Sequence, residues 1–215
     1  MPAKNVLKIY RPNSYYHIYN RGVDKRTIFK NTQDYAVFLN YLKEYLSPLP
    51  EKHPQRQIAV NNKDYKINDY QCRNYCNSVI LIAYCLMTNH FHLLIKQTDA
   101  RNIELFMRSF ATRYTSYFNK RYQRSGTLFE GPYKAVLIDS DEQLLHLSRY
   151  IHLNPSPNLF KQPSSYPDYL QLKNTSWVYS QDILKYFKNP LAYKHFVEAE
   201  NQSSLSIITN FTLDS

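Results

Sequence analysis

The chain has 215 residues, of which 43% are hydrophobic, and this is enough to bury the core of one domain. Three cysteines are too few for a disulfide framework, and residues 1–30 hold no apolar segment long enough for a signal peptide, so we expect a cytoplasmic protein. Only three glycines are present, which excludes a glycine-rich nucleotide-binding loop.

The formal net charge of +10 is concentrated in two blocks. Residues 1–30 carry seven Lys or Arg against one acidic residue, and residues 101–135 carry seven against two, whereas residues 136–215 carry six against eight. The 21 tyrosines and 11 phenylalanines place aromatic rings among these cations. A protein that binds single-stranded nucleic acid uses cations to neutralise the phosphates and aromatic rings to stack on the bases. We therefore favour a nucleic-acid partner over a basic surface that serves solubility alone.

The first half of the chain predicts a strand, a helix and an insertion. Residues 15–20 are rich in β-forming side chains and stop before Gly22, which predicts the first strand. Apolar residues at helical spacing predict a helix over 34–46, with Thr32 as its cap. Residues 48–78 are polar and show little periodicity, so we expect an inserted loop, within which 58–67 could pair as short strands.

The longest apolar run, VILIAYCLMTNHFHLLIKQ (79–97), predicts a hairpin with strands at 79–86 and 90–96. Its histidines and central turn argue against a membrane span of similar length. Alternation along a strand places His90 and His92 on one face and Phe91 on the other. Paired imidazoles on a rigid strand can form half of a metal site. Composition alone gives about 0.2 His-x-His pairs, so a chance pair remains the alternative.

The second half predicts a helix over 103–121, a strand over 133–138 and a helix over 141–154 with Ser140 as its N-cap. The order strand, helix, strand, strand, helix, strand is that of a ferredoxin-like split βαβ fold. This is an α+β fold with an antiparallel sheet and two core helices on one face. The helix over 141–154 could then return across the other face of the sheet.

Two regions define the expected organisation of the chain. Residues 1–157 form the predicted domain, with 48–78 inserted into it. Residues 158–215 are irregular and form a C-terminal appendage rather than a second domain, with short amphipathic pieces near 180–187 and 191–197.

Tyr150 and Asn154 lie one helical turn apart, so they share a face of the last predicted helix. If this face meets the histidine face, Asn154 can supply an oxygen to a metal and Tyr150 can reach a phosphate bound to the same ion. Nitrogen and oxygen ligands of this kind suit Mg²⁺ or Mn²⁺. A free tyrosine, with a pKa near ~10, needs such an ion to attack a phosphate efficiently. The attack would leave a reversible phosphotyrosine bond.

For each of these residues, the sequence also allows a structural role or a competing candidate. Tyr114, Tyr117 and Tyr122 are rivals of Tyr150, although the first two share an apolar stripe and are better core candidates. His152 points away from Tyr150 by about 200° on a helical wheel, which favours a structural role. Asn154, which precedes a proline, could equally be a helix stop.

Four sequence segments follow one another in order: YHIYNRG (16–22), AYCLMTNHFHLLI (83–95), RYTSYFNKRYQRSGTLFEGPYK (113–134) and RYIHLNP (149–155). Together they resemble the single-tyrosine HUH transposases, and the REP-associated tyrosine transposases in particular. The resemblance covers roughly residues 16–158. The chain departs from the family pattern at Pro132, where Arg commonly stands, and in its long 48–78 insertion.

The resemblance implies a ferredoxin-like transposase that acts on single-stranded DNA with hairpins. Because the apolar run is interrupted by histidines and a turn, we expect no membrane partner. His90 and His92 then match the family's metal ligands, and Tyr150 matches the nucleophile that forms a 5′-phosphotyrosine. Asn154 stands where relatives place a further polar ligand, often Gln. Transposases of this kind are usually dimeric, which makes a homodimer an expectation that rests on the resemblance alone.

We expect DNA contacts from five basic residues of the second charge block: Arg113, Lys120, Arg121, Arg124 and Lys134. Two other functions are alternatives to a transposase. One is a non-catalytic nucleic-acid-binding protein derived from this fold, which would need neither the histidines nor Tyr150. The other is a metal-dependent phosphodiesterase that uses water, in which Tyr150 would be dispensable.

Overall fold

The computed structural model describes residues 9–49, 55–60, 63–68 and 73–199. Its centre is a four-stranded antiparallel sheet in the order β4-β5-β1-β6. The strands are β1 (Ser14–Arg21), β4 (Val79–Met87), β5 (His90–Gln97) and β6 (Lys134–Ile138). The hairpin of β4 and β5 lies beside β1, and β6 pairs with the opposite edge of β1. This is the strand order of a ferredoxin-like fold, as the sequence predicts.

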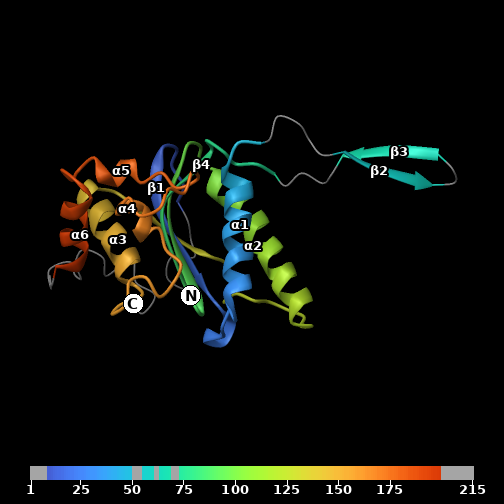
Figure 1. Ribbon diagram of the computed structural model, residues 1–215, viewed down its shortest axis with the longest axis horizontal. Coiled ribbons are helices and arrows are strands. Elements are labelled where there is room, and N and C mark those ends of the chain that lie inside the picture. The colour runs from blue at the N-terminus through green and yellow to red at the C-terminus, as the bar shows by residue number, and fades with distance from the viewer. Residues whose placement is uncertain (1–8, 50–54, 61–62, 69–72, 200–215) are drawn as a thin grey trace.

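Helices cover both faces of this sheet (Figure 1). The helices α1 (Thr32–Leu46) and α2 (Asn102–Arg121) pack on one face. The other face carries α3 (Asp141–Leu153), α4 (Tyr166–Tyr169), α5 (Gln181–Leu184) and α6 (Pro190–Glu198). The two predicted core helices therefore share a face, and the helix after β6 returns across the opposite one. No described helix has the length and apolar character needed to cross a membrane.

Side-chain caps fix where α1 and α3 begin. Ser140 accepts a hydrogen bond from the Gln143 backbone amide at 3.2 Å, as its predicted capping role requires. The cap of α1 is Asn31 rather than the predicted Thr32. The Asn31 side chain accepts from the amides of Gln33 and Asp34 at 3.1 and 3.3 Å, so Thr32 becomes the first helical residue.

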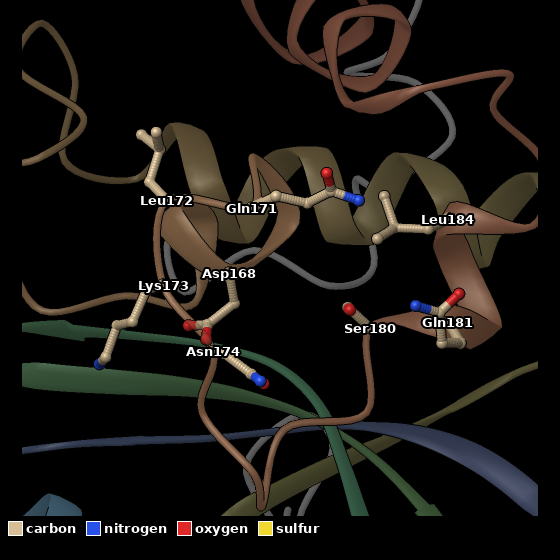
Figure 2. A pocket seen from close by; sticks show the side chains of 8 residues that line it. All are labelled: Asp168, Gln171, Leu172, Lys173, Asn174, Ser180, Gln181 and Leu184. Carbon is tan, nitrogen blue, oxygen red and sulfur yellow. The ribbon is translucent and has the colours of Figure 1, made fainter.

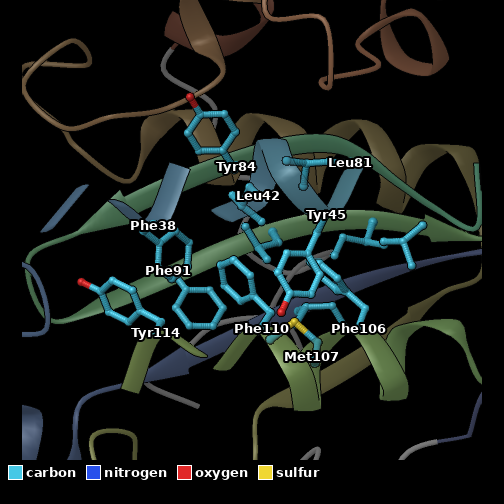
Figure 3. Packing of buried hydrophobic residues seen from close by; sticks show 14 of the residues in the cluster. Phe38, Leu42, Tyr45, Leu81, Tyr84, Phe91, Phe106, Met107, Phe110 and Tyr114 are labelled. Atoms are coloured by element: carbon cyan, nitrogen blue, oxygen red, sulfur yellow. The ribbon is translucent and has the colours of Figure 1, made fainter. Parts of the chain in front are cut away.

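The core between the sheet and α1–α2 is largely aromatic (Figure 3). The Phe38 ring meets those of Phe110 and Tyr114 edge-on, with centroid distances of 4.7 and 5.0 Å. Phe91 projects from β5 into the same cluster, at 5.4 Å from Phe38. Burying one such ring contributes roughly 1.5–3 kcal/mol. Phe91 thus packs β5 against the helices on one face of the sheet, and His90 and His92 lie on the other face.

The chain after α3 completes the second core and covers the edge of β4. The Leu86 amide donates to Pro163 O at 2.9 Å, and the Ser165 amide donates to Tyr84 O at 3.0 Å. Tyr179 donates from its amide to the Leu81 carbonyl at 2.8 Å. These bonds occupy backbone groups that an edge strand otherwise leaves unpaired. The predicted appendage therefore packs on the sheet as far as α6, while residues 200–215 lie outside the described part.

The 48–78 insertion contains a second hairpin, β2 (Gln55–Val60) and β3 (Lys63–Asn68). These strands pair antiparallel, with Ile58 opposite Tyr65, in the region where short paired strands are expected. Figure 1 shows this hairpin projecting away from the sheet and its helices.

Candidate active site

Strand β5 presents His90 and His92 on the face covered by α3. His92 lies opposite Cys85 of β4 and Tyr19 of β1, and it is fully buried. His90 is the first residue of β5 and is half-buried. Their rings are 5.0 Å apart and nearly perpendicular. The predicted pair of imidazoles on one face is therefore present.

A loop wrapped around the β4–β5 turn holds the start of β5. The Gly22 amide donates to Asn89 O at 2.8 Å, and the amides of Ile28 and Phe29 both donate to Thr88 O. Gly22 permits this close wrapping, because a Cβ built at this position would lie 2.2 Å from Arg26 O.

Helix α3 brings Tyr150 and Asn154 to the histidines. The Asn154 Oδ1 atom lies 3.2 Å from His90 Nε2, and its Nδ2 lies 3.5 Å from His92 Nε2. The Tyr150 ring meets the His92 ring edge-on at 5.4 Å between centroids. The four residues predicted for the metal and catalytic site therefore converge, although the histidines and the α3 pair lie more than fifty residues apart in the chain.

Three potential metal donors meet at this point: two imidazole nitrogens and one amide oxygen. Burial, together with the neighbouring His17 and His90, holds the pKa of His92 well below its usual range, so its ring is neutral and can donate a lone pair. An octahedral ion with bonds of about 2.1 Å separates adjacent ligands by about 3 Å, close to the 3.2 Å between Asn154 Oδ1 and His90 Nε2. No group of three His, Cys, Asp or Glu among the described side chains could hold a metal, and a metal at this point would use the Asn154 oxygen beside the two imidazoles. The residues present fit Mg²⁺ or Mn²⁺.

The rival tyrosines are engaged elsewhere. Tyr114 is fully buried and donates to Ile28 O at 2.7 Å. Tyr117 and Tyr122 both donate to the buried carboxylate of Asp34, at 2.9 and 2.8 Å. The Tyr117 and Tyr122 hydroxyls connect α2 to α1, and the Tyr114 hydroxyl connects α2 to the segment before α1. Of these four tyrosines, only Tyr150 lies beside the histidines.

Buried polar contacts fix the helix that carries Tyr150. Arg149 donates from Nε to Phe196 O at 2.8 Å and from Nη2 to Ala199 O, at the end of α6. His152 bonds Tyr193 Oη at 2.7 Å and Ser165 Oγ at 2.8 Å, and burial lowers its pKa to about 3. His152 therefore has the structural role that the helical wheel favours. Both residues attach α3 to the chain that follows it.

The five predicted DNA-contact residues are dispersed. The guanidinium of Arg113 lies over the Tyr41 ring at 3.8 Å and pairs with Glu44 at 2.6 Å, so it joins α2 to α1. The other four residues have different surroundings. Arg121 lies 3.6 Å from Asp34, and Arg124 donates to Asn119 and Thr127. Lys120 is exposed, and Lys134 lies over the Tyr19 ring. Of these five, Lys134 lies on β6, beside the strand that carries Tyr19.

Sequence reasoning missed two residues beside the histidines, His17 and Asn89. His17 Nε2 lies 2.9 Å from His92 Nδ1, and Asn89 Oδ1 lies 2.7 Å from His90 Nδ1. The strand that contains His17 is predicted correctly, but which strand lies beside β5 depends on the sheet order. Asn89 reads as an ordinary turn residue.

A polar cavity of about 420 Å³ lies outside this site. Its lining comes from the chain between α4 and α5, including Asp168, Lys173 and Gln181 (Figure 2). None of the residues that converge around His90 borders it.

Comparisons with known proteins point to transposases. Residues 54–154 match the family model of IS200-like transposases, an interval that contains both histidines, Tyr150 and Asn154. The solved structure of a REP-associated tyrosine transposase bound to a REP hairpin is similar in fold, with a TM-score of 0.53 and 10% identity, covering 80% of this chain and 95% of that chain. A putative transposase from Deinococcus radiodurans has a TM-score of 0.39 and 13% identity, covering 70% of this chain and 95% of that chain, too weak a likeness for detailed comparison. No curated protein matches the sequence.

Proposed function

We propose that the chain is a single-tyrosine transposase of the IS200-like family, and that it cleaves and rejoins single-stranded DNA through a covalent bond to Tyr150. The observation that carries this proposal is the position of the Tyr150 ring, 5.4 Å from the His92 ring, on a helix that also brings Asn154 to both histidines. Binding alone would need no such arrangement of a phenol beside three potential metal donors.

The proposed step is an in-line displacement at phosphorus. The Tyr150 oxygen loses its proton and forms a bond to the phosphorus, while the bond from phosphorus to the 3′ oxygen breaks. The 3′ oxygen leaves with a proton as a hydroxyl, and the 5′ phosphate stays on Tyr150. Because one phosphodiester replaces another, a 3′ hydroxyl can attack the tyrosyl phosphodiester and rejoin a strand without an external energy source.

His90, His92 and Asn154 would hold the Mg²⁺ or Mn²⁺ ion that this chemistry requires. Bound there, the ion would offset charge on the phosphate oxygens and orient the phosphate for attack. The protein contributes rigidity: His92 is buried in the sheet, and Arg149 and His152 fix the helix that carries Tyr150. The reacting groups therefore need little reorganisation when DNA binds.

The proposed substrate is single-stranded DNA that carries a hairpin. The structural neighbour in complex with a REP hairpin supports this choice, as does the net charge of +10. Lys120 and Lys134 are the first candidates for phosphate contacts, because Lys120 is exposed and Lys134 lies near the site. Arg113 is a weaker candidate, because its charge already pairs with Glu44.

Covalent capture tests this function. End-labelled single-stranded hairpin DNA is incubated with the protein and Mn²⁺, and the adduct is resolved under denaturing conditions. We expect an adduct with the native chain and none with Tyr150→Phe. Tyr179→Phe is the matched control, because Tyr179 is 51% exposed and lies outside the site, so its adduct should equal that of the native chain.

Other outcomes identify the alternatives. Cleavage that survives in Tyr150→Phe would mean that water is the nucleophile, and the protein would be a phosphodiesterase. DNA binding without any adduct, in Mg²⁺ or Mn²⁺, would indicate a non-catalytic binding protein.

A further inference from the structure

Each of the two histidines uses its two ring nitrogens differently. Both Nε2 atoms face Asn154, at 3.2 Å for His90 and 3.5 Å for His92. Both Nδ1 atoms face another protein group, Asn89 for His90 and His17 for His92. A neutral imidazole carries its proton on only one nitrogen, so the group at Nδ1 determines whether Nε2 has a free lone pair.

At His90, the orientation of the Asn89 amide is fixed from outside the site. Asn89 Nδ2 donates to the backbone carbonyl of Lys25 at 3.2 Å, and a carbonyl can only accept. The Asn89 atom that faces His90 Nδ1 is therefore the oxygen, at 2.7 Å. An oxygen at this distance requires a proton on Nδ1, which leaves the lone pair of neutral His90 on Nε2.

At His92, the partner is the buried ring of His17. The two rings are stacked, with 5.0 Å between centroids and 19° between planes, and His17 Nε2 lies 2.9 Å from His92 Nδ1. Stacking of His17 on Tyr19, at 4.7 Å, holds the ring from its other side. Either ring nitrogen could donate in this hydrogen bond, but Asn154 Nδ2, which can only donate, faces His92 Nε2 at 3.5 Å. This contact favours a lone pair on His92 Nε2 and therefore a proton on His92 Nδ1.

The Asn154 amide fits this assignment at His92, where Nδ2 can donate to Nε2 at 3.5 Å, but opposes it at His90, where the amide oxygen faces Nε2 at 3.2 Å. Its oxygen faces one imidazole Nε2 whichever way the amide is turned, because the nitrogen and oxygen each face one histidine. With both Nε2 atoms unprotonated, the amide oxygen and the lone pair of the Nε2 atom that it faces repel each other. A cation bound between them would remove this repulsion.

We propose that Asn89 and His17 are positioning residues that hold the protons of His90 and His92 on Nδ1, so that both Nε2 lone pairs point to the metal position. This inference rests on the proposed metal-dependent function and adds two residues to it. Partners of this kind orient metal-binding histidines, and their removal typically costs 10–100-fold in metal affinity.

The first test needs no metal. Nitrogen-15 spectra of the imidazole rings in the metal-free full chain, at a pH where the rings are neutral, report which nitrogen carries the proton. We expect Nδ1 to be protonated in both His90 and His92. An Nε2-protonated ring in either histidine overturns the proposal, whatever the protein does with metal.

The second test measures Mn²⁺ affinity by electron paramagnetic resonance in matched pairs of variants. Asn89→Leu and His17→Phe remove the acceptor and should weaken binding by about 10–100-fold. Asn89→Asp and His17→Gln keep an acceptor, and their affinity should fall by less than about threefold. Thermal unfolding of each metal-free variant is the control for folding, because loss of packing alone would lower stability equally within a pair.

The two proposals fail in different ways. Equal Mn²⁺ affinity for the two members of each pair would overturn the positioning role. A native chain that binds no Mn²⁺, but whose two rings carry their protons on Nδ1, would overturn the metal-dependent function while supporting the proton assignment.

Discussion

Asn154 is the site residue whose chemistry is most easily changed without changing its shape. It follows α3 with helical backbone angles (φ −52°, ψ −37°), and its side chain spans the two histidines. An amide supplies a neutral oxygen, so the proposed site holds a divalent cation without any carboxylate. Ligand charge is one of the main determinants of affinity for such ions.

Replacing Asn154 with Asp should therefore tighten Mn²⁺ binding by about tenfold, because a carboxylate of the same shape adds a negative charge. Asn154→Leu removes the oxygen and should weaken binding by about the same factor. Isothermal titration of the two variants against the native chain measures both changes. Equal affinities for all three proteins would exclude Asn154 as a ligand.

At the scale of elements, α3 depends on the chain that follows it. The hydroxyl of Tyr193 in α6 bonds both His152 Nδ1, at 2.7 Å, and Ser148 Oγ, at 3.2 Å. His152 and Ser148 are both fully buried and lie on α3. The hydroxyl thus satisfies polar atoms that the fold has removed from water, and leaving such an atom unsatisfied is costly.

Tyr193→Phe should lower the free energy of unfolding by roughly 1–3 kcal/mol, because it leaves His152 Nδ1 without this partner. Denaturant titration followed by circular dichroism measures the change. Tyr179→Phe removes the same atom from a half-exposed ring and should shift the free energy by no more than about 0.5 kcal/mol. If both variants lost the same stability, the buried network would have no special role.

At the scale of the molecule, the proposed site is complete within one chain. The histidines on β5 and Tyr150 on α3 come from the same copy, and the chain's own residues 163–165 and Tyr179 cover the edge of β4. An edge occupied in this way is not available for pairing with the β4 edge of another copy. The homodimer expected from the family resemblance stays a prediction, but completing the site does not require it.

Mixing two inactive variants tests this self-sufficiency. Tyr150→Phe lacks the nucleophile, and His90→Ala lacks one proposed metal ligand at a half-buried position. We expect no more covalent DNA adduct from the mixture than from the two variants separately. If mixing restores the adduct, the tyrosine of one copy acts with the histidines of another. In that case α3 must separate from its own sheet.

Local periodicity was enough to predict several features of the site and the fold. Alternation along β5 places His90 and His92 opposite Phe91, and helical spacing aligns Tyr150 with Asn154. The order of strands and helices predicts the ferredoxin-like sheet, because short connections and antiparallel pairing allow few other arrangements. The core role of Tyr114 follows from helical spacing in the same way, whereas the 48–78 insertion is recognised by its polar composition and lack of periodicity.

Which residues distant in sequence lie in contact is known only from the tertiary structure. His17 lies beside His92 because β1 is inserted between β5 and β6, and no local pattern encodes that neighbour. Asn89 acquires its orientation from Lys25 O, a group more than sixty residues away in the chain. Likewise, the pairing of Arg113 with Glu44 depends on how α2 packs on α1. Periodicity fixes the face on which a side chain lies, whereas its partner is set by non-local packing, which a single sequence does not display.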